Sequence, residues 1–449
     1  MESTFLMKAD RFLQVKTILV FISFVFIFIV HEYIGQTVTF IALDLVLSIY
    51  LVSIFNGKYR YLFLIHPVFI LFSSYGFLIP FTDIGVGFTY VNTFDMLFDA
   101  SLGVNEVASS EAYIDSNKVF WFSKIYYSII PIIWLPKFLY SNPDNITLYY
   151  SMGFFTMLFT ALAVYASQYL HILKKNILLI YALYATISPT FLEINSSLHR
   201  YQLLFFGLFL FLISYIGLVK KRNSWHRIAV LIFILFASIF FIGLSKPQLL
   251  LVLLVFVFID MTISGKLSMV SSMANYLDIR VLFILIIFLI QAFGYFIIPD
   301  GYVTDAFQVG GKFNSIASIP VLGYVVRLVY AVLSPFPWID FSQMSIYGYN
   351  LIFFIMHIFS SFLASWMILT LFVRFKMILK CNYDNEGTIV LFGFVTTFSL
   401  MFSSIGFHVY LAPALPFLAV LLKDKYRISI IYPIFFIFFM EIVAQLLRY

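Results

Sequence analysis

Cysteine and charge are the two scarcest features of this chain of 449 residues. Its one cysteine, Cys381, excludes a disulfide within the chain and any zinc site built on several cysteines. Only 11% of the residues are charged, whereas 63% are hydrophobic. A water-soluble core does not need so much apolar surface, but a bilayer does, because each crossing takes about 20 apolar residues. The composition therefore predicts an integral membrane protein.

Several motifs of nucleotide, haem and hydrolase chemistry are also absent from the sequence. It contains no Walker loop, GxGxxG or CxxCH motif, and no GxSxG elbow or HExxH motif. Five histidines do not combine into a metal-ligand spacing: His31, His66, His171, His226 and His357. These absences give no support to an ATP-driven pump, a nicotinamide enzyme, a serine hydrolase or a zincin. We expect neither a cofactor nor a metal.

Long apolar runs recur along the whole chain and predict its fold class. Lipid offers no hydrogen-bond partner to an open backbone, so each run is expected to be a helix. The predicted fold is all-α, a polytopic integral membrane protein with about 12–14 transmembrane helices, outward-facing loops and a possible re-entrant segment. The expected spans are 17–31, 36–55, 61–81, 147–170, 176–192, 201–219, 228–244, 248–264, 281–298, 349–372, 388–406, 410–422 and 428–446.

The positions of the basic residues predict which ends of these spans share a side. The net charge of +6 could indicate nucleic-acid binding, but the cations gather between spans, as in cytoplasmic loops. With a basic N-terminus inside, the pairs Lys58/Arg60 and Lys174/Lys175 fall on one side. We therefore expect membrane lipids as neighbours, no nucleic acid, and a single membrane domain over 1–449. Its longest outer loop is 82–120, and a second outer or re-entrant region is 299–348.

The first apolar run is expected to remain part of the chain as an uncleaved span. Basic residues precede it, as in a signal peptide, but His31, Glu32 and Tyr33 stand where a small-residue cleavage site would lie.

Three cations stand apart from the basic clusters, in segments that the topology places on the outer side: Arg200, Lys246 and Arg327. Arg200 and Lys246 each precede a span, and a helix N-terminus favours anions through its free N–H groups. Guanidinium groups suit phosphate oxygens because their donors form a planar fork. Arg200 could instead snorkel to the headgroups or pair with Glu193, and Lys246 could be an interfacial anchor. Together they would suit a pyrophosphate or another polyanionic head group.

Acidic residues and histidines on the outer side are candidates for proton transfer. Glu193 and Asp305 belong to the acids that dominate this side, and His199 and His408 can titrate near neutral pH. An ordinary hydrogen-bonded histidine remains the alternative for each imidazole. Three further acids, Asp44, Asp260 and Glu441, fall within or at the ends of expected spans and are weak indications of a proton pathway.

Four stretches resemble, in order, elements of bacterial oligosaccharide repeat-unit polymerases. Residues 189–212, PTFLEINSSLHRYQLLFFGLFLFL, resemble an element in which an Arg opens a span after a Pro-containing one. The next element resembles LSKPQLLL at 244–251, and the Arg-then-Pro-x-Pro-Trp segment is similar to 327–338, RLVYAVLSPFPW. The terminal Arg-Tyr-x-x-Pro pattern resembles 407–419, FHVYLAPALPFLA. In this chain no acid directly follows Arg200, Lys246 stands where Arg is usual, and His408 replaces Arg.

The resemblance implies a Wzy-type O-antigen polymerase of the bacterial inner membrane, active on the periplasmic face. Such an enzyme joins oligosaccharide repeat units linked to undecaprenyl pyrophosphate, without a metal, and works with a chain-length regulator. On this hypothesis Arg200, Lys246 and Arg327 bind the pyrophosphate, and His408, Asp305 or Glu193 accepts the proton.

Two other functions remain open. A GT-C type glycosyltransferase would add single sugars from a polyprenyl-phosphate donor, but its usual acidic pair in the first outer loop is not present, since only Glu32 lies there. A lipid-linked oligosaccharide flippase would need charged residues at the midplane of several helices and repeated halves.

Overall fold

The computed structural model describes ten stretches of the chain: 2–78, 135–136, 138–140, 143–191, 201–220, 224–246, 248–264, 351–380, 385–403 and 411–448. Helices make up almost all of these residues, and no strand occurs among them. Five helices in these stretches are long and apolar enough to cross a membrane: Phe12–Ile34, Gln36–Ile54, Tyr150–Tyr169, Gln202–Lys220 and Trp225–Ser245. The prediction of an all-α polytopic membrane protein is confirmed.

The chain divides into two compact units, which are described separately. Unit 1 comprises residues 1–247 with 346–353, and unit 2 comprises 248–345 with 354–449. The expected span 281–298 and the predicted loops 82–120 and 299–348 lie outside the described residues. The prediction of one domain over 1–449 stays a prediction.

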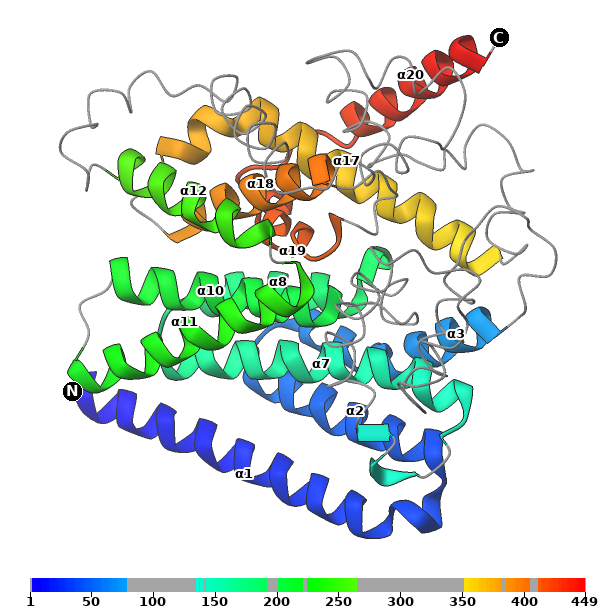
Figure 1. Cartoon of the computed structure of the whole chain (residues 1–449), viewed down its shortest axis with the longest axis vertical. Helices are drawn as coiled ribbons and strands as arrows, with labels where there is room; N and C mark the ends of the chain where they lie inside the picture. Colours follow the sequence, from blue (N-terminus) through cyan, green and yellow to red (C-terminus); the bar gives the residue numbers. More distant parts are fainter. Residues whose placement is uncertain are drawn as a thin grey trace, which may run out of the picture. The chain divides into compact units, whose positions relative to one another are not determined.

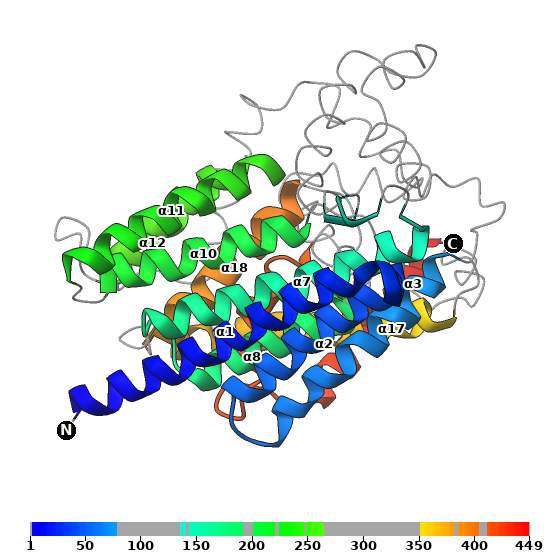
Figure 2. The ribbon, with the colours of Figure 1, turned by 90° about the horizontal axis from the view of Figure 1, so that it is seen from below.

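Unit 1 is built from antiparallel neighbours in the order of the sequence (Figure 1 and Figure 2). A single residue, Gly35, joins the first two helices with a φ of 83°, which glycine adopts without a Cβ penalty. The most extensive pairing joins the helices Tyr201–Lys220 and Trp225–Ser245. The helix Gln36–Ile54 packs on both Glu2–Ile34 and Asn145–Tyr169. The elements are α1 (Glu2–Ile34), α2 (Gln36–Ile54), the 3-10 helix η1 (Lys58–Ile65), α3 (His66–Leu78), α7 (Asn145–Tyr169), α8 (Lys175–Ile187), α10 (Tyr201–Lys220) and α11 (Trp225–Ser245).

The helices of unit 1 differ in how much of their surface is buried, which distinguishes a core helix from a peripheral one. In the apolar stretch of α10, 89% of the residues are buried, against 11% in the apolar stretch of α1. Large apolar side chains such as Phe21, Phe26 and Ile29 remain exposed along α1. Since apolar groups are stable in lipid, α1 has the composition of a lipid-facing helix, while α10 is surrounded by protein.

Cations gather at one end of unit 1, which we call the basic end and define by Lys16, Arg60 and Lys175. The positive charges of Lys175 and Arg60 act on Lys16, although the three residues come from three different elements. Lys16 Nζ donates to Ser53 O, and Arg60 donates to Phe55 O at 2.9 Å, both at the carboxyl end of α2. Cations are favoured at that end of a helix because its last carbonyls are unpaired and carry negative partial charge.

The opposite end of unit 1 is defined by Gly35 and Asp144. There Gln36 Oε1 accepts from the backbone N–H of Asp144 at 2.8 Å, and the hydroxyls of Thr37 and Thr147 lie 3.0 Å apart. These contacts make α2 and α7 parallel, with their first turns side by side. The hairpin of α10 and α11 brings the start of α10 to the end of α11, beside Lys246 in the sequence.

Unit 2 has an aromatic core between three elements. Phe392 of α18 meets Phe256 of α12 and Phe417 of α19 edge to face, with ring centroids 5.0 and 4.8 Å apart. Its helices are α12 (Gln248–Ile263), α17 (Leu351–Lys380, nearly all in this unit), α18 (Asn385–Ser403), α19 (Leu415–Leu418), the 3-10 helix η5 (Ala419–Leu422) and α20 (Ile431–Arg448).

One expected span differs from the structure. Hydropathy predicts a transmembrane helix over 410–422, but 411–422 contain only the four residues of α19 followed by the 3-10 turn η5. Pro413 and Pro416 explain the difference, because neither has a backbone N–H to continue an α-helical hydrogen-bond ladder. All residues from 411 to 420 are nevertheless buried, so the segment keeps its apolar core role.

A carboxylate joins the start of α18 to the segment after η5. Lys423 Nζ donates to Glu386 Oε1 at 2.7 Å, and the Tyr426 hydroxyl donates to Oε2 at 2.8 Å. Burial would raise the pKa of Glu386, but the hydrogen bonds from Lys423 and Tyr426 outweigh it, so the pKa lies below its usual value.

The close approach of α7 to α3 gives a test of packing. A Cβ at Gly153 would lie 2.5 Å from Ile70 Cγ2, so Gly153→Ala should lower the stability of the protein by about 1–3 kcal/mol. Ile70→Ala alone should cost about 2–5 kcal/mol, because it leaves a cavity. Since the new methyl group occupies that cavity, the double variant should be less destabilised than the sum of the two. Additive losses in thermal unfolding in detergent would show that the helices do not meet here.

The contacts of Glu386 predict a dependence of stability on pH. The folded-state pKa is lower than the unfolded one, so the stabilisation is complete above about pH 4.5 and is lost as the pH falls through the folded value. Glu386→Gln should cost about 1 kcal/mol at pH 7, given the partial exposure of both partners. As the pH falls through the folded-state pKa of Glu386, the unfolding midpoint of the variant should approach that of the wild type. An unchanged difference between the two proteins from neutral to acidic pH would contradict the assignment.

Candidate functional site: a buried aspartate, histidine and tyrosine

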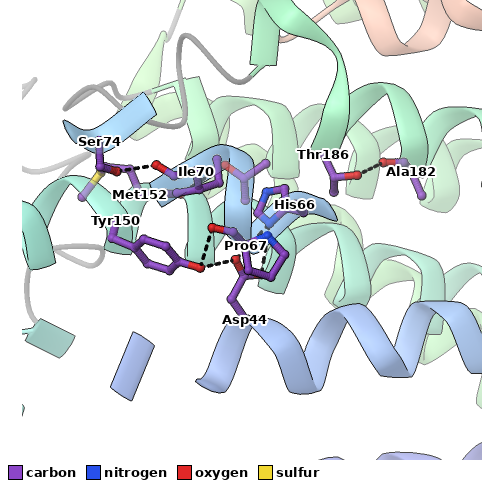
Figure 3. A network of polar contacts seen from close by, with 10 residues as sticks. Asp44, His66, Pro67, Ile70, Ser74, Tyr150, Met152, Ala182 and Thr186 are labelled. Atoms are coloured by element: carbon purple, nitrogen blue, oxygen red, sulfur yellow. Dashed lines mark hydrogen bonds and ion pairs between the residues drawn. The ribbon is translucent and has the colours of Figure 1, made fainter. Parts of the chain in front are cut away.

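An ionisable residue lies in the middle of an apolar helix of unit 1. Asp44 is the ninth residue of the 19-residue α2 and is 0% exposed. A carboxylate at such a depth is costly unless it is paired, and acids inside membrane helices are therefore candidates for function. The surroundings of Asp44 are shown in Figure 3.

Asp44 accepts hydrogen bonds from two other elements. Oδ2 lies 3.0 Å from His66 Nδ1 and 3.0 Å from the Tyr150 hydroxyl, and Oδ1 lies 3.1 Å from the same Nδ1 (Figure 3). His66 and Tyr150 are also 0% exposed. We call these three residues the Asp44 cluster. It joins α2, the start of α3 and α7 through a single carboxylate.

Local sequence explains why these three side chains meet. Thr37 and Asp44 are seven residues apart, so they lie on one face of α2, two turns from each other. On α7, Thr147 and Tyr150 are three residues apart and also share a face. The contact between Thr37 and Thr147 therefore sets a register in which Asp44 faces Tyr150.

His66 is positioned by the junction between the 3-10 helix η1 and α3. It is the first residue of α3 and is followed by Pro67, which is tolerated in the first turn because no N–H is needed there. The Pro67 carbonyl oxygen lies 3.4 Å from the Tyr150 hydroxyl, a second and weaker acceptor for that group. The junction thus places the imidazole against α2 and the following carbonyl against α7.

The two ring nitrogens of His66 have different surroundings. Nδ1 faces both carboxylate oxygens, and we assign it the proton because an ionised carboxylate can only accept. Nε2 is buried and has no hydrogen-bond partner in the described part of the chain. A neutral His66 leaves the carboxylate charge unbalanced inside the bundle, whereas a protonated His66 balances it.

Five of the six predicted site residues lie outside the described residues: Glu193, Arg200, Asp305, Arg327 and His408. Their roles stay predictions. Lys246 is described. It follows α11 directly, its backbone N–H donates to Ile242 O at 2.7 Å, and only 6% of the residue is exposed. It precedes Gln248, the first residue of α12, in the sequence.

Sequence reasoning finds only part of the Asp44 cluster. It ranks Asp44 as one of three acids within or near expected spans, and it tests His66 only as a metal ligand. It does not single out Tyr150. An ionisable residue in each of two apolar segments is the signal that the sequence contains, but the partner of each depends on the register between helices that are distant in sequence.

Among the residues that the structure describes, no group of three or more His, Cys, Asp or Glu side chains could hold a metal ion. The fold and the cluster together define an all-α integral membrane protein with a buried ionisable site. The chain matches no protein-family model, no curated protein and no solved structure.

Removal of the hydroxyl from Tyr150 tests the cluster against a matched tyrosine. Tyr150→Phe should lower stability by about 1–3 kcal/mol, because it deletes a hydrogen bond to a buried carboxylate. Tyr140→Phe deletes a contact of 2.7 Å to the Thr39 hydroxyl on α2 and weaker ones to the carbonyl oxygens of His31 and Gly35, at 3.2 and 3.4 Å. This position is half-buried, so about 0.5–1.5 kcal/mol is expected. Equal unfolding midpoints for the two variants in detergent would argue against a special role for the cluster.

Proposed function

We propose that this protein polymerises oligosaccharide repeat units carried on undecaprenyl pyrophosphate, at the periplasmic face of a bacterial inner membrane. The observation that carries the proposal is the position of Lys246. This cation is 6% exposed and directly follows the last residue of α11. Positive charge in cytoplasmic loops is expected of any polytopic protein, whereas a nearly buried lysine at the end of an apolar helix is a candidate for function.

The placement of helix ends supports a polyanion site around Lys246. The start of α10 and the end of α11 meet, and the residue that precedes Tyr201 in the sequence is Arg200. The two cations of the predicted site thus flank helix ends that the fold brings together. In the proposal Arg327 is the third cation, and all three bind the pyrophosphate.

The proposed reaction needs charge stabilisation and one base. A hydroxyl oxygen of the acceptor sugar attacks the anomeric carbon, and the bond from that carbon to the pyrophosphate oxygen breaks. Undecaprenyl pyrophosphate leaves with the electron pair, and preorganised cations stabilise the charge that builds on it. The proton of the attacking hydroxyl passes to a base, for which His408, Asp305 and Glu193 are the candidates.

The surface polysaccharide of a strain that lacks the gene tests the proposal. The deletion strain should display lipid core capped by one repeat unit, and the wild-type gene should restore the ladder of longer chains. Lys246→Ala should abolish the ladder while the protein stays in the membrane, and Lys246→Arg should retain it because the charge is kept. Lys175→Ala, at the basic end, is the matched control and should leave the ladder unchanged.

The variants test the individual residues, and the deletion strain tests the proposed function. A normal ladder with Lys246→Ala would remove that lysine from the site, and normal ladders with Arg200→Ala or Arg327→Ala would remove those arginines. A deletion strain with a normal ladder would exclude polymerisation by this protein.

The Asp44 cluster favours a second candidate, transport of the lipid-linked oligosaccharide. Transporters place ionisable residues within their helices, and Asp44 and His66 occupy such a position. Loss of even the single capped unit in the deletion strain would support transport in place of polymerisation, because the unit would no longer reach the outer face.

A further inference from the structure

We propose that Asp44, His66 and Tyr150 form a proton-binding site inside the membrane-embedded part of unit 1, with His66 Nε2 as the atom that gains and loses the proton. This site is independent of the pyrophosphate site proposed above. It involves none of the residues assigned to glycosyl transfer.

The first step is the charge balance of the cluster. The carboxylate of Asp44 already accepts from two donors, His66 Nδ1 and the Tyr150 hydroxyl, at 3.0 Å each. Both donors direct a hydrogen toward the same carboxylate, so its acceptor capacity is used within the cluster. The remaining place for a proton in the cluster is Nε2, because Nδ1 is occupied and a tyrosine hydroxyl is a poor base near neutral pH.

Each protonation state of His66 leaves one part of the cluster unsatisfied. With Nε2 unprotonated, one negative charge stays in a fully buried position, where low polarity makes it expensive. With Nε2 protonated, the pair is neutral overall, but the new N–H has no acceptor among the described residues. Histidine is the side chain whose ordinary charge change falls near physiological pH, which makes it the residue type suited to binding and releasing a proton.

A second unpaired polar atom lies on the same helix face. Ser48 is four residues after Asp44 on α2, is 0% exposed, and its hydroxyl has no partner in the described stretches. Residues four apart on a helix are neighbours. This hydroxyl places a further donor and acceptor one turn from Asp44, on the side of the basic end.

The other ionisable groups on the elements that pack against His66 do not replace Asp44 as its partner. The helices α2, α3, α7 and α8 and the 3-10 helix η1 contain no acid other than Asp44, and Asp144 caps α7 at the opposite end. The remaining titratable side chains on these elements for which the structure describes the burial are Tyr50, Lys58, Tyr59, Arg60, Tyr61, Tyr165, Tyr169, Lys174, Lys175, Tyr181 and Tyr184.

Nitrogen NMR of the imidazoles tests the proposal directly. The full-length protein, labelled with ¹⁵N-histidine and held in lipid bilayers, would be compared at pH 5 and pH 8. His66→Gln identifies the His66 signals among those of the seven histidines, and the wild-type protein supplies the measurement itself. We expect Nε2 to change from a protonated nitrogen at pH 5 to an unprotonated one at pH 8, with Nδ1 protonated throughout.

Two results would overturn the proposal. An unprotonated Nε2 at both pH values would make the cluster a fixed hydrogen bond, and a protonated Nε2 at both would make it a permanent ion pair. Asp44→Asn should leave Nε2 unprotonated at pH 5, because the balancing charge is gone, whereas Tyr150→Phe keeps that charge and should retain the protonated form. If Nε2 stayed protonated at pH 5 in the Asp44→Asn variant, Asp44 would not be the group that holds the proton.

Discussion

The inability of lipid to form hydrogen bonds is the constraint on which the rest of this structure depends. It requires every backbone group within the membrane to be paired inside the protein, which helices achieve locally. It also makes each polar side chain between the helices expensive unless another side chain satisfies it. Few of the buried polar side chains that the structure describes are ionisable, and those few locate contacts where helices are specified rather than merely packed.

Unit 1 meets this constraint with polar contacts at several depths along α2. At the opposite end, Thr37 and Gln36 hold the start of α7, and at the basic end Lys16 and Arg60 supply donors to the last carbonyls of α2. Between them the Asp44 cluster joins α2, α3 and α7 through three fully buried side chains. An apolar helix pair could slide or rotate at little cost, but a carboxylate with two donors fixes both register and rotation.

Much of the fold follows from hydrophobicity and charge. The positions of α1, α2, α7, α10 and α11 agree with the expected spans, since runs of apolar residues have one solution in a bilayer. The cation pairs predict the basic end, which the mutual influence of Lys16, Arg60 and Lys175 supports. The expected span at 410–422 is wrong because hydropathy alone does not register the missing N–H groups of Pro413 and Pro416.

The candidate sites are less accessible from sequence. Asp44 and His66 stand out singly as ionisable residues in apolar runs, but their pairing depends on how α3 packs on α2. Tyr150 resembles the other tyrosines, since only its hydrogen bond to Asp44 distinguishes it. For the outer cations, the sequence identifies single positive charges between spans. Whether they share a site depends on how the ends of different helices come together in the fold, and Lys246 lies at one such end, that of α11.

The assignment of the two ends of unit 1 to the two sides of the membrane is the central claim, because the proposed chemistry at Lys246 requires the opposite end to face outward. Accessibility of single cysteines to a membrane-impermeant thiol reagent in intact cells tests it most directly, with Cys381 replaced by serine. Cysteine at the exposed position of Glu32, near Gly35, should react from outside, and cysteine at exposed Asn56, near Arg60, should react only after the cells are permeabilised. The reverse pattern would place Lys246 on the cytoplasmic side and contradict a periplasmic pyrophosphate site.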